Sequence, residues 1–176
     1  MLIIKSTERT CRMRILFADD EVEVRQEIAK SLKKVGYEVI EVGDGIELLK
    51  QLAPQNPNKP DLIITDILIP KLDGHTVANV AKKQLKITTP IIALTAIPPN
   101  SIIDISEPFV DILHKPADPH DVLKIILTLT CPNCCNSILS VDYKQHHHFD
   151  CKKCHKKYVL QQQDGELVLT EKINLK

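Results

Sequence analysis

Two groups of side chains in this sequence have types and spacings suited to chemistry. In the first group, Asp19, Asp20, Asp66, Thr95 and Lys115 each stand at or just after the end of a short apolar run. Carboxylates that gather in one place repel one another unless a divalent cation or an amine lies among them. Oxygen-rich sites of this kind suit Mg²⁺. A lysine opposite such carboxylates can hold a transferred phosphoryl group.

The second group is a set of cysteines near the end of the chain. The pair Cys131 and Cys134 is separated by 16 residues from the pair Cys151 and Cys154, and two C-x-x-C pairs at such a distance are typical of a zinc site. Each pair can turn as a knuckle, so that four thiolates complete a closed tetrahedral site of the structural kind. A small segment with few large apolar side chains needs such a metal to fold. We therefore expect a zinc ribbon that holds one structural Zn²⁺.

Other interpretations of the cysteines are weaker. A redox dithiol or an iron–sulfur site does not need two paired knuckles at this spacing. Cys135 and His155 each follow a knuckle at a position where ribbons often have glycine, so both crowd the turn slightly. Cys135 is interpreted as a spare thiol, and no role is expected for Cys11. A short histidine tract is interpreted as a solvated turn rather than a second metal site: His146, His147 and His148.

Apolar periodicity between residues 13 and 129 predicts the elements that position the acidic group. Short continuous apolar runs are typical of buried parallel strands, and helical periods lie between them. We expect an α/β fold with a doubly wound, five-stranded parallel sheet. In such a sheet the residues of the acidic group lie together at the carboxyl ends of the strands. The expected strands are Arg14–Ala18, Glu38–Val42, Leu62–Thr65, Pro90–Leu94 and Val110–Leu113, and the expected helices are Val24–Val35, Ile46–Leu52, His75–Leu85 and Pro119–Leu129.

The chain divides into three segments. Residues 1–12 have no period and are interpreted as an N-terminal extension, either a mobile arm or an over-long start. Residues 13–129 form the α/β domain, and residues 130–176 form a small β zinc-ribbon module with two strands around a turn at Asp164 and Gly165. No flexible linker separates Leu129 from Cys131, so we expect the last two segments to pack together.

Composition excludes several classes of protein. A 43% hydrophobic content over 176 residues supports a folded core. The 23 basic and 23 acidic residues balance, which does not favour a general binder of polyanions. No apolar run approaches the roughly 20 residues of a membrane helix, and Met1–Ile4 is too short for a signal-peptide core. We expect a cytoplasmic protein with no membrane partner.

Four sequence blocks resemble, in order, the motifs of the response-regulator receiver domain: Phe17–Glu21, Pro60–Gly74, Pro90–Ala96 and Lys115–Pro116. The resemblance covers about residues 13–129. It implies a two-component or phosphorelay protein in which Asp66 accepts phosphate from a histidine kinase or a phosphotransfer protein. It also implies that the domain is not a stand-alone enzyme, because it catalyses only its own phosphotransfer and dephosphorylation.

The same resemblance implies how the pocket binds Mg²⁺. Asp20 and Asp66 are implied to ligate the ion directly, Asp19 through a water molecule, and Leu68 through its backbone carbonyl. Considered by itself, Asp20 has a second interpretation, because Asp20 and Glu23 have the spacing of a capping box at the start of the first helix.

The remaining pocket residues are implied to act on the phosphoryl group. Thr95 is implied to bind it and to shift on activation, whereas Lys115 pairs with the phosphate and forms a cis peptide bond with Pro116. Considered singly, Thr95 fits an ordinary strand and Lys115 a solvated loop. Ile112 stands where the family usually has an aromatic switch residue. Prolines within residues 97–108 predict a short, displaced or missing fourth helix, and hence altered or absent dimerisation through it.

The ribbon is expected to act as a protein-interaction or self-association module, with a partner that the sequence does not identify. The alternative is a nucleic-acid-binding transcriptional regulator that uses the lysines around the second knuckle. Few aromatic residues are available for stacking and no recognition helix is visible, which favours the first interpretation. The lysines in question are Lys152, Lys153, Lys156 and Lys157.

Overall fold

Five parallel strands form the central sheet. The computed structural model describes residues 3–5, 13–98, 107–129, 131, 133–134, 148–151, 154–163 and 166–171. The strand order across the sheet is β3-β2-β4-β5-β6, so the chain winds first to one side of β2 and then to the other. The expected doubly wound α/β fold is confirmed, with every strand within one residue of its predicted bounds. The strands are β2 (Arg14–Ala18), β3 (Glu38–Val42), β4 (Leu62–Asp66), β5 (Ile91–Thr95) and β6 (Asp111–His114).

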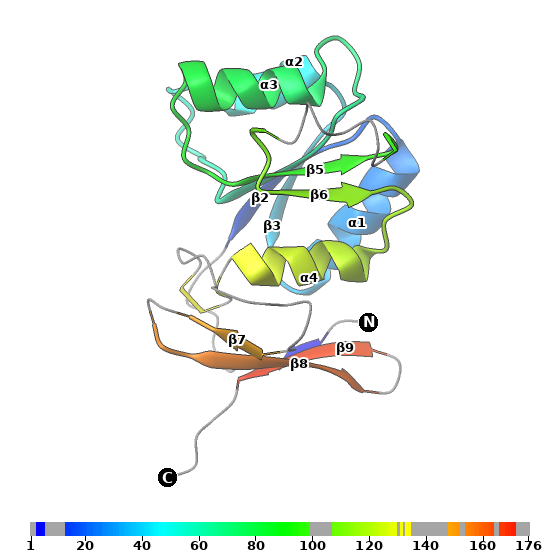
Figure 1. Cartoon of the computed structure of the whole chain (residues 1–176), viewed down its shortest axis with the longest axis vertical. Helices are drawn as coiled ribbons and strands as arrows, with labels where there is room; N and C mark the ends of the chain where they lie inside the picture. The colour runs from blue at the N-terminus through cyan, green and yellow to red at the C-terminus, as the bar shows by residue number, and fades with distance from the viewer. Residues whose placement is uncertain are drawn as a thin grey trace.

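Helices cover both faces of this sheet (Figure 1). Side chains alternate along each strand, so Phe17 packs on the α1 and α4 side, whereas Leu16 packs on the α2 and α3 side. The helix expected at His75–Leu85 is divided into an α-helix and a π-helical turn. Among the described residues, no helix is long and apolar enough to span a membrane. The helical elements are α1 (Val22–Lys34), α2 (Gly45–Gln51), α3 (Gly74–Asn79), η1 (Val80–Gln84) and α4 (Pro119–Leu129).

Two expectations fall on stretches outside the described residues. The altered fourth helix was expected within residues 97–107, of which the structure describes only 97–98 and 107. The turn at Asp164 and Gly165 is likewise outside the description. The altered helix and the altered dimerisation therefore stay predictions.

A second sheet is built from both ends of the chain. It contains β1 (Ile3–Lys5), β7 (His148–Asp150), β8 (Lys157–Gln163) and β9 (Glu166–Glu171), in the order β1-β9-β8-β7. Strands β7, β8 and β9 are antiparallel, and β1 runs parallel to β9. Residues 3–5 of the segment interpreted as a mobile arm or an over-long start form β1, which pairs along β9. His148 lies in a strand and not in a solvated turn.

The two sheets share one hydrophobic cluster. Cys131, Cys151 and Tyr158 are buried together with Met13 and Ile126 on the α1 and α4 side of the central sheet. Helix α4 ends only two residues before Cys131, so the chain enters the second module without a spacer. The expectation that the α/β domain and the cysteine-rich segment pack against each other is confirmed.

Candidate functional site

Three carboxylates meet at the carboxyl edge of the central sheet. One oxygen atom from each of Asp19, Asp20 and Asp66 lies within 4.8 Å of the other two. Asp19 and Asp66 are buried at the ends of β2 and β4, whereas Asp20 is exposed. The capping-box interpretation of Asp20 is wrong, because Glu21 is the N-cap residue of α1 and no side chain caps this helix.

Lys115 lies among these carboxylates, just beyond the end of β6. Its Nζ atom is 2.6 Å from Asp66 Oδ2, 3.0 Å from Asp19 Oδ2 and 2.7 Å from Glu21 Oε1. Burial by itself lowers the pKa of Lys115. Hydrogen bonds to Asp66, Glu21 and Asp19 outweigh that effect and hold the pKa above its ordinary value. Lys115 is therefore a fixed cation at neutral pH.

Backbone amides orient the two buried carboxylates. Asp19 Oδ1 accepts a hydrogen bond of 2.9 Å from the amide of Glu21, and Asp66 Oδ1 accepts one of 2.9 Å from the amide of Leu68. Burial raises the pKa of Asp19, although Lys115 opposes the shift. One amine thus faces several carboxylates, and this oxygen donor set fits a hard divalent cation such as Mg²⁺.

Thr95 completes the pocket at the end of β5. Its side chain is fully buried, and Thr95 Oγ1 accepts a hydrogen bond of 3.2 Å from the amide of Ile97. The amide of Lys115 donates to the carbonyl of Thr95 at 2.8 Å, which ties the two residues together. The peptide bond between Lys115 and Pro116 is cis, as the resemblance implies. Ile112 lies in β6 opposite Ala93 and is half-buried.

Sequence reasoning did not assign roles to two residues that shape this pocket. Glu21 pairs with Lys115. Its position directly after the two aspartates indicates in the sequence that it belongs to the acidic pocket. Gly74 begins α3, where a Cβ atom would lie 2.0 Å from the Asp66 carbonyl oxygen and 2.8 Å from Thr65 Oγ1. Only glycine lets α3 approach the end of β4 this closely.

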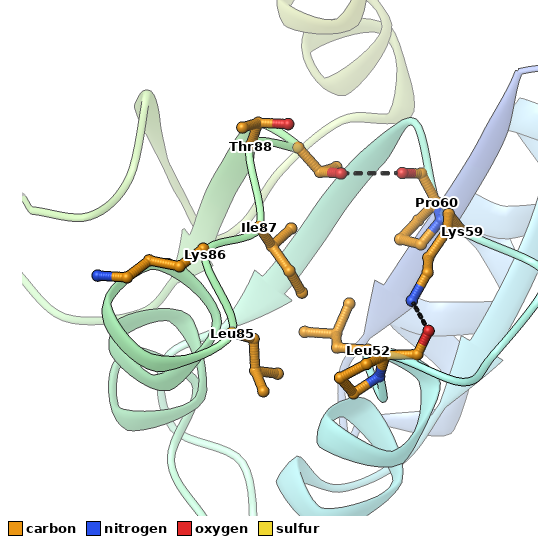
Figure 2. Close-up of a pocket in the computed structure, with 9 residues that line it drawn as sticks. Leu52, Lys59, Pro60, Leu85, Lys86, Ile87 and Thr88 are labelled. Carbon is orange, nitrogen blue, oxygen red and sulfur yellow. Dashed lines mark hydrogen bonds between the residues drawn. The ribbon is translucent and has the colours of Figure 1, made fainter.

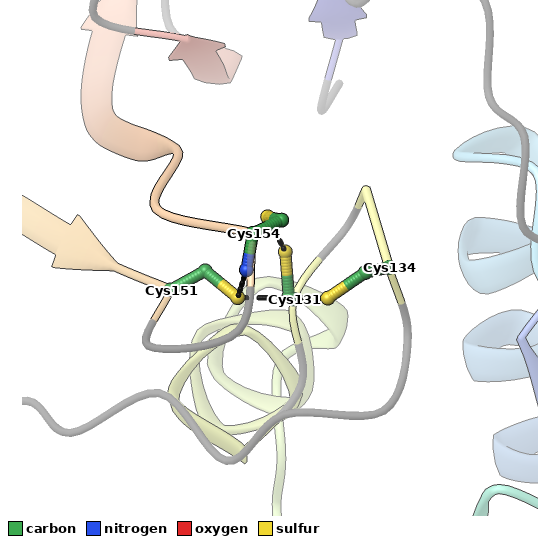
Figure 3. A group of neighbouring side chains, drawn as sticks. All are labelled: Cys131, Cys134, Cys151 and Cys154. Carbon is green, nitrogen blue, oxygen red and sulfur yellow. Dashed lines mark hydrogen bonds between the residues drawn. The ribbon is translucent and has the colours of Figure 1, made fainter.

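The four cysteines of the expected zinc ribbon come together at the other end of the domain (Figure 3). Their sulfur atoms all lie within 4.8 Å of one another, and the pairs Cys131–Cys154 and Cys134–Cys151 are separated by 3.5 Å. A tetrahedral site with Zn–S bonds of about 2.3 Å has sulfur–sulfur distances of about 3.8 Å. The arrangement therefore fits a tetrahedral metal ion.

The knuckle backbones also match a thiolate site. The amide of Asn133 donates to Cys131 Sγ and the amide of Cys154 donates to Cys151 Sγ, both at 3.4 Å. His155 follows with a φ of 59°, the left-handed conformation that favours glycine. Burial raises the pKa of the Cys131 thiol to about 12. A buried thiolate at this position needs a cation beside it.

The lysines of the nucleic-acid alternative are only partly described. Lys156 is half-buried and Lys157, the first residue of β8, is exposed. Lys152 and Lys153 lie outside the described residues, as do Cys135, His146 and His147. The structure therefore adds nothing in favour of a basic nucleic-acid surface.

A pocket of about 380 Å³ lies away from both sites (Figure 2). It opens where β4 and β5 begin, opposite the edge that carries Asp66. Its lining includes Leu52, Leu85 and Ile87, and the side chain of Lys86 extends away from it. None of the candidate site residues lines this pocket.

Comparison with known proteins identifies the family. The family model described as the response regulator receiver domain matches residues 15–127, which is most of the chain and contains every residue of the acidic pocket. The chain belongs to this family. The match ends before the first cysteine of the zinc-ribbon pattern.

Individual relatives are similar to about half of the chain. The alkaline phosphatase synthesis transcriptional regulatory protein PhoP of Bacillus subtilis is 41% identical over 83 residues, which are 47% of this chain and 33% of PhoP. The transcriptional regulatory protein PdtaR of Mycobacterium tuberculosis is 38% identical over 93 residues, 52% of this chain and 42% of PdtaR. The matched part thus spans less than half the length of these relatives, both of which are named as transcriptional regulatory proteins.

Solved structures give the same result for the fold. The chemotaxis response regulator CheY4 of Vibrio cholerae has a TM-score of 0.59 at 27% identity, covering 66% of this chain and 97% of CheY4. A putative response regulator from Chloroflexus aurantiacus has a TM-score of 0.59 at 31% identity, covering 66% of this chain and 95% of that chain. The central sheet and its helices therefore have the fold of a receiver domain.

Proposed function

We propose that this chain is a phosphorylatable response regulator of two-component or phosphorelay signalling. Asp66 accepts the phosphoryl group, and the donor is a phosphohistidine of a histidine kinase or a phosphotransfer protein. The observation that carries the proposal is the position of the Asp66 carboxylate. One oxygen is held by the amide of Leu68 and the other by Lys115, at the strand edge where Asp19 and Asp20 also meet.

The chemistry is a transfer between two nucleophiles. An Asp66 carboxylate oxygen attacks phosphorus, a P–O bond forms, and the P–N bond breaks with its electron pair leaving on the imidazole. Lys115 lies close enough to Asp66 to pair with a phosphoryl oxygen once the acyl phosphate forms. Thr95 is the hydroxyl donor for a second oxygen, at the end of the neighbouring strand.

The donor set supports a Mg²⁺ site in this pocket. Asp20 and Asp66 are the proposed direct ligands, Asp19 is proposed to act through water, and Leu68 is proposed to contribute its carbonyl. When bound, Mg²⁺ supplies positive charge to the transferring phosphoryl oxygens. The exposed position of Asp20 leaves it free to turn toward an incoming ion.

The test uses phosphoramidate, which carries the same P–N bond as phosphohistidine. Intact-mass measurement is expected to show one added phosphoryl group in the presence of Mg²⁺ and little in its absence. Asp66→Asn is expected to abolish the addition, because the amide is not a nucleophile. Asp61→Asn is the matched control, since Asp61 lies before β4 and contacts the amide of Arg14 instead. Addition that persists in Asp66→Asn would contradict the proposal.

For the ribbon, we infer a protein-interaction or self-association role built on a structural zinc site at Cys131, Cys134, Cys151 and Cys154. What supports it is the convergence of the four sulfurs beside a sheet whose edge strands, β1 and β7, suit strand addition by a partner. The relatives named as transcriptional regulators match only about half of this chain, and the match to the receiver family model ends at residue 127. Nucleic-acid binding that weakens steeply with added salt would instead support the lysine-cluster alternative.

A further inference from the structure

We propose that the four-cysteine site governs the stability of the receiver domain, so that zinc occupancy decides whether Asp66 can be phosphorylated. This inference rests on the proposed zinc site and extends it. The ribbon is then a metal-dependent part of the receiver fold as well as a surface for partners.

The first support is burial of the metal ligands within the receiver's own core. Cys131 and Cys151 are 1% and 2% exposed, and both belong to the hydrophobic cluster that contains Leu32 of α1 and Ile126 of α4. Tyr158 of β8 lies in the same cluster, with its hydroxyl 3.8 Å from Cys131 Sγ. One knuckle residue from each pair thus packs as receiver core.

The second support is that this cluster continues along the strands that carry the acidic pocket. Phe17, Ile64 and Leu94 are buried in it. Phe17 stands two residues before Asp19, Ile64 two residues before Asp66, and Leu94 directly before Thr95. Loosening of the cluster at the cysteine end therefore acts on the strands whose ends position the phosphate-accepting residues.

The third support is the path of the chain. Strand β1 comes before the receiver and pairs with β9, which comes after it. In the sequence, the receiver therefore lies between strands that pair with each other in one small sheet. Helix α4 leads into the first knuckle and ends at Leu129. A metal ion that joins the two knuckles fixes the end of α4 to the start of β8.

A metal ion would join the two cysteine pairs more strongly than the contacts among their thiol groups. Thiol groups form only weak hydrogen bonds, and the sulfur atoms of the two pairs approach one another to 3.5 Å. Because zinc binds the folded site and stabilises it, its release removes that stability from every element that unfolds with the site. Hydrogen exchange can show which elements those are.

The experiment compares the full zinc-loaded chain with the same chain treated with a zinc chelator. Zinc content is measured by elemental mass spectrometry, and hydrogen exchange is followed in peptides from β2, β4 and β8. We expect exchange to accelerate by at least about tenfold in all three peptides after zinc removal. Thermal unfolding is expected to move down by roughly 10 °C or more. The initial rate of phosphorylation by phosphoramidate is expected to fall in parallel.

Matched cysteine variants separate metal loss from other effects of the chelator. Cys134→Ser removes one half-buried ligand and is expected to reproduce the chelated state, whereas Cys135→Ser changes the neighbouring cysteine and is expected to behave as the parent chain. If Cys134→Ser does not fold, a chelator titration of the parent chain gives the same comparison.

The outcomes distinguish this inference from the proposed function. Bound zinc whose removal accelerates exchange only in the β8 peptide, with β2, β4 and phosphorylation unchanged, would overturn the coupling and leave the zinc site intact. A chain that binds no zinc would overturn both the zinc site and the coupling. Loss of phosphoryl addition in Asp66→Asn is independent of either result.

Discussion

A single amine organises the charge in the acidic pocket. Lys115 contacts Asp66, Asp19 and Glu21 at once, so one positive charge faces three negative ones and Asp20 adds a fourth nearby. Such an excess of negative charge is unfavourable unless a cation joins it. The pocket is thus suited to a cation such as Mg²⁺, and the proposed transfer of a phosphoryl group would give Lys115 a new anionic partner.

Addition of a single methyl group at Gly74 is predicted to disturb the acidic pocket. In Gly74→Ala, the new Cβ would lie 2.0 Å from the Asp66 carbonyl oxygen, so the end of β4 or the start of α3 must move. We expect a loss of about 1–3 kcal/mol in the free energy of unfolding and slower phosphorylation of Asp66. Denaturant titration and the intact-mass assay measure these two effects.

Gly43→Ala is the matched control. A Cβ at Gly43 meets only Arg25 Nη1, at an ordinary contact distance of 3.6 Å. This variant is expected to keep both the stability and the phosphorylation rate of the parent chain. Equal behaviour of the two alanine variants would contradict the steric role given to Gly74.

At the scale of elements, α3 depends on its cap. Asp73 Oδ1 accepts a hydrogen bond of 2.8 Å from the amide of Thr76, and Asp73 Oδ2 accepts one of 2.7 Å from the Thr76 hydroxyl. We expect Asp73→Ala to lower the free energy of unfolding by about 1 kcal/mol. That corresponds to a decrease of roughly 2–4 °C in the melting temperature, which calorimetry can measure.

The same cap predicts a pH dependence. Burial raises the pKa of Asp73, but the hydrogen bonds from Thr76 outweigh burial and hold the pKa below the usual 3.8. The stabilisation is therefore complete above this usual value and is lost as the pH falls through the lowered pKa. Asp73→Asn keeps a good cap without this titration. An Asp73→Ala defect that is unchanged at acidic pH would argue against the carboxylate as the cap.

The sequence predicts the larger elements well and the smallest ones poorly. The inner strands β2, β4 and β5 are buried on both faces, so their apolar runs are continuous and easily recognised, whereas the edge strands β3 and β6 are mostly half-buried. Strands β1 and β7 have only three residues each. Their formation depends on pairing with β9 and β8, which local periodicity does not report. The π-helical turn η1 continues the apolar period of α3, and for that reason it was predicted as ordinary helix.

The sequence also predicts some features of the candidate sites and not others. Asp19, Asp66, Thr95 and Lys115 were predicted to converge because parallel strands bring their carboxyl ends to one edge. The closeness of the four cysteines was predicted from their spacing alone. Burial of Cys131 in the receiver core could not be predicted from the sequence, because it depends on how the second sheet packs against the receiver.

For the whole molecule, the two candidate sites lie at opposite ends of one core. The acidic pocket lies at the carboxyl ends of the central strands, whereas the cysteines pack near Met13, just before the start of β2. The same hydrophobic cluster connects these ends. This organisation differs from that of a receiver joined to an independent module by a free linker.

The most direct test of the account is native mass spectrometry of the full chain with Mg²⁺, before and after phosphoramidate is added. The account predicts one bound zinc ion and one added phosphoryl group, with the phosphoryl group lost and the zinc ion kept in Asp66→Asn. A zinc-loaded chain that gains no phosphoryl group, or gains one that survives Asp66→Asn, would contradict the central claim that Asp66 is the phosphate acceptor.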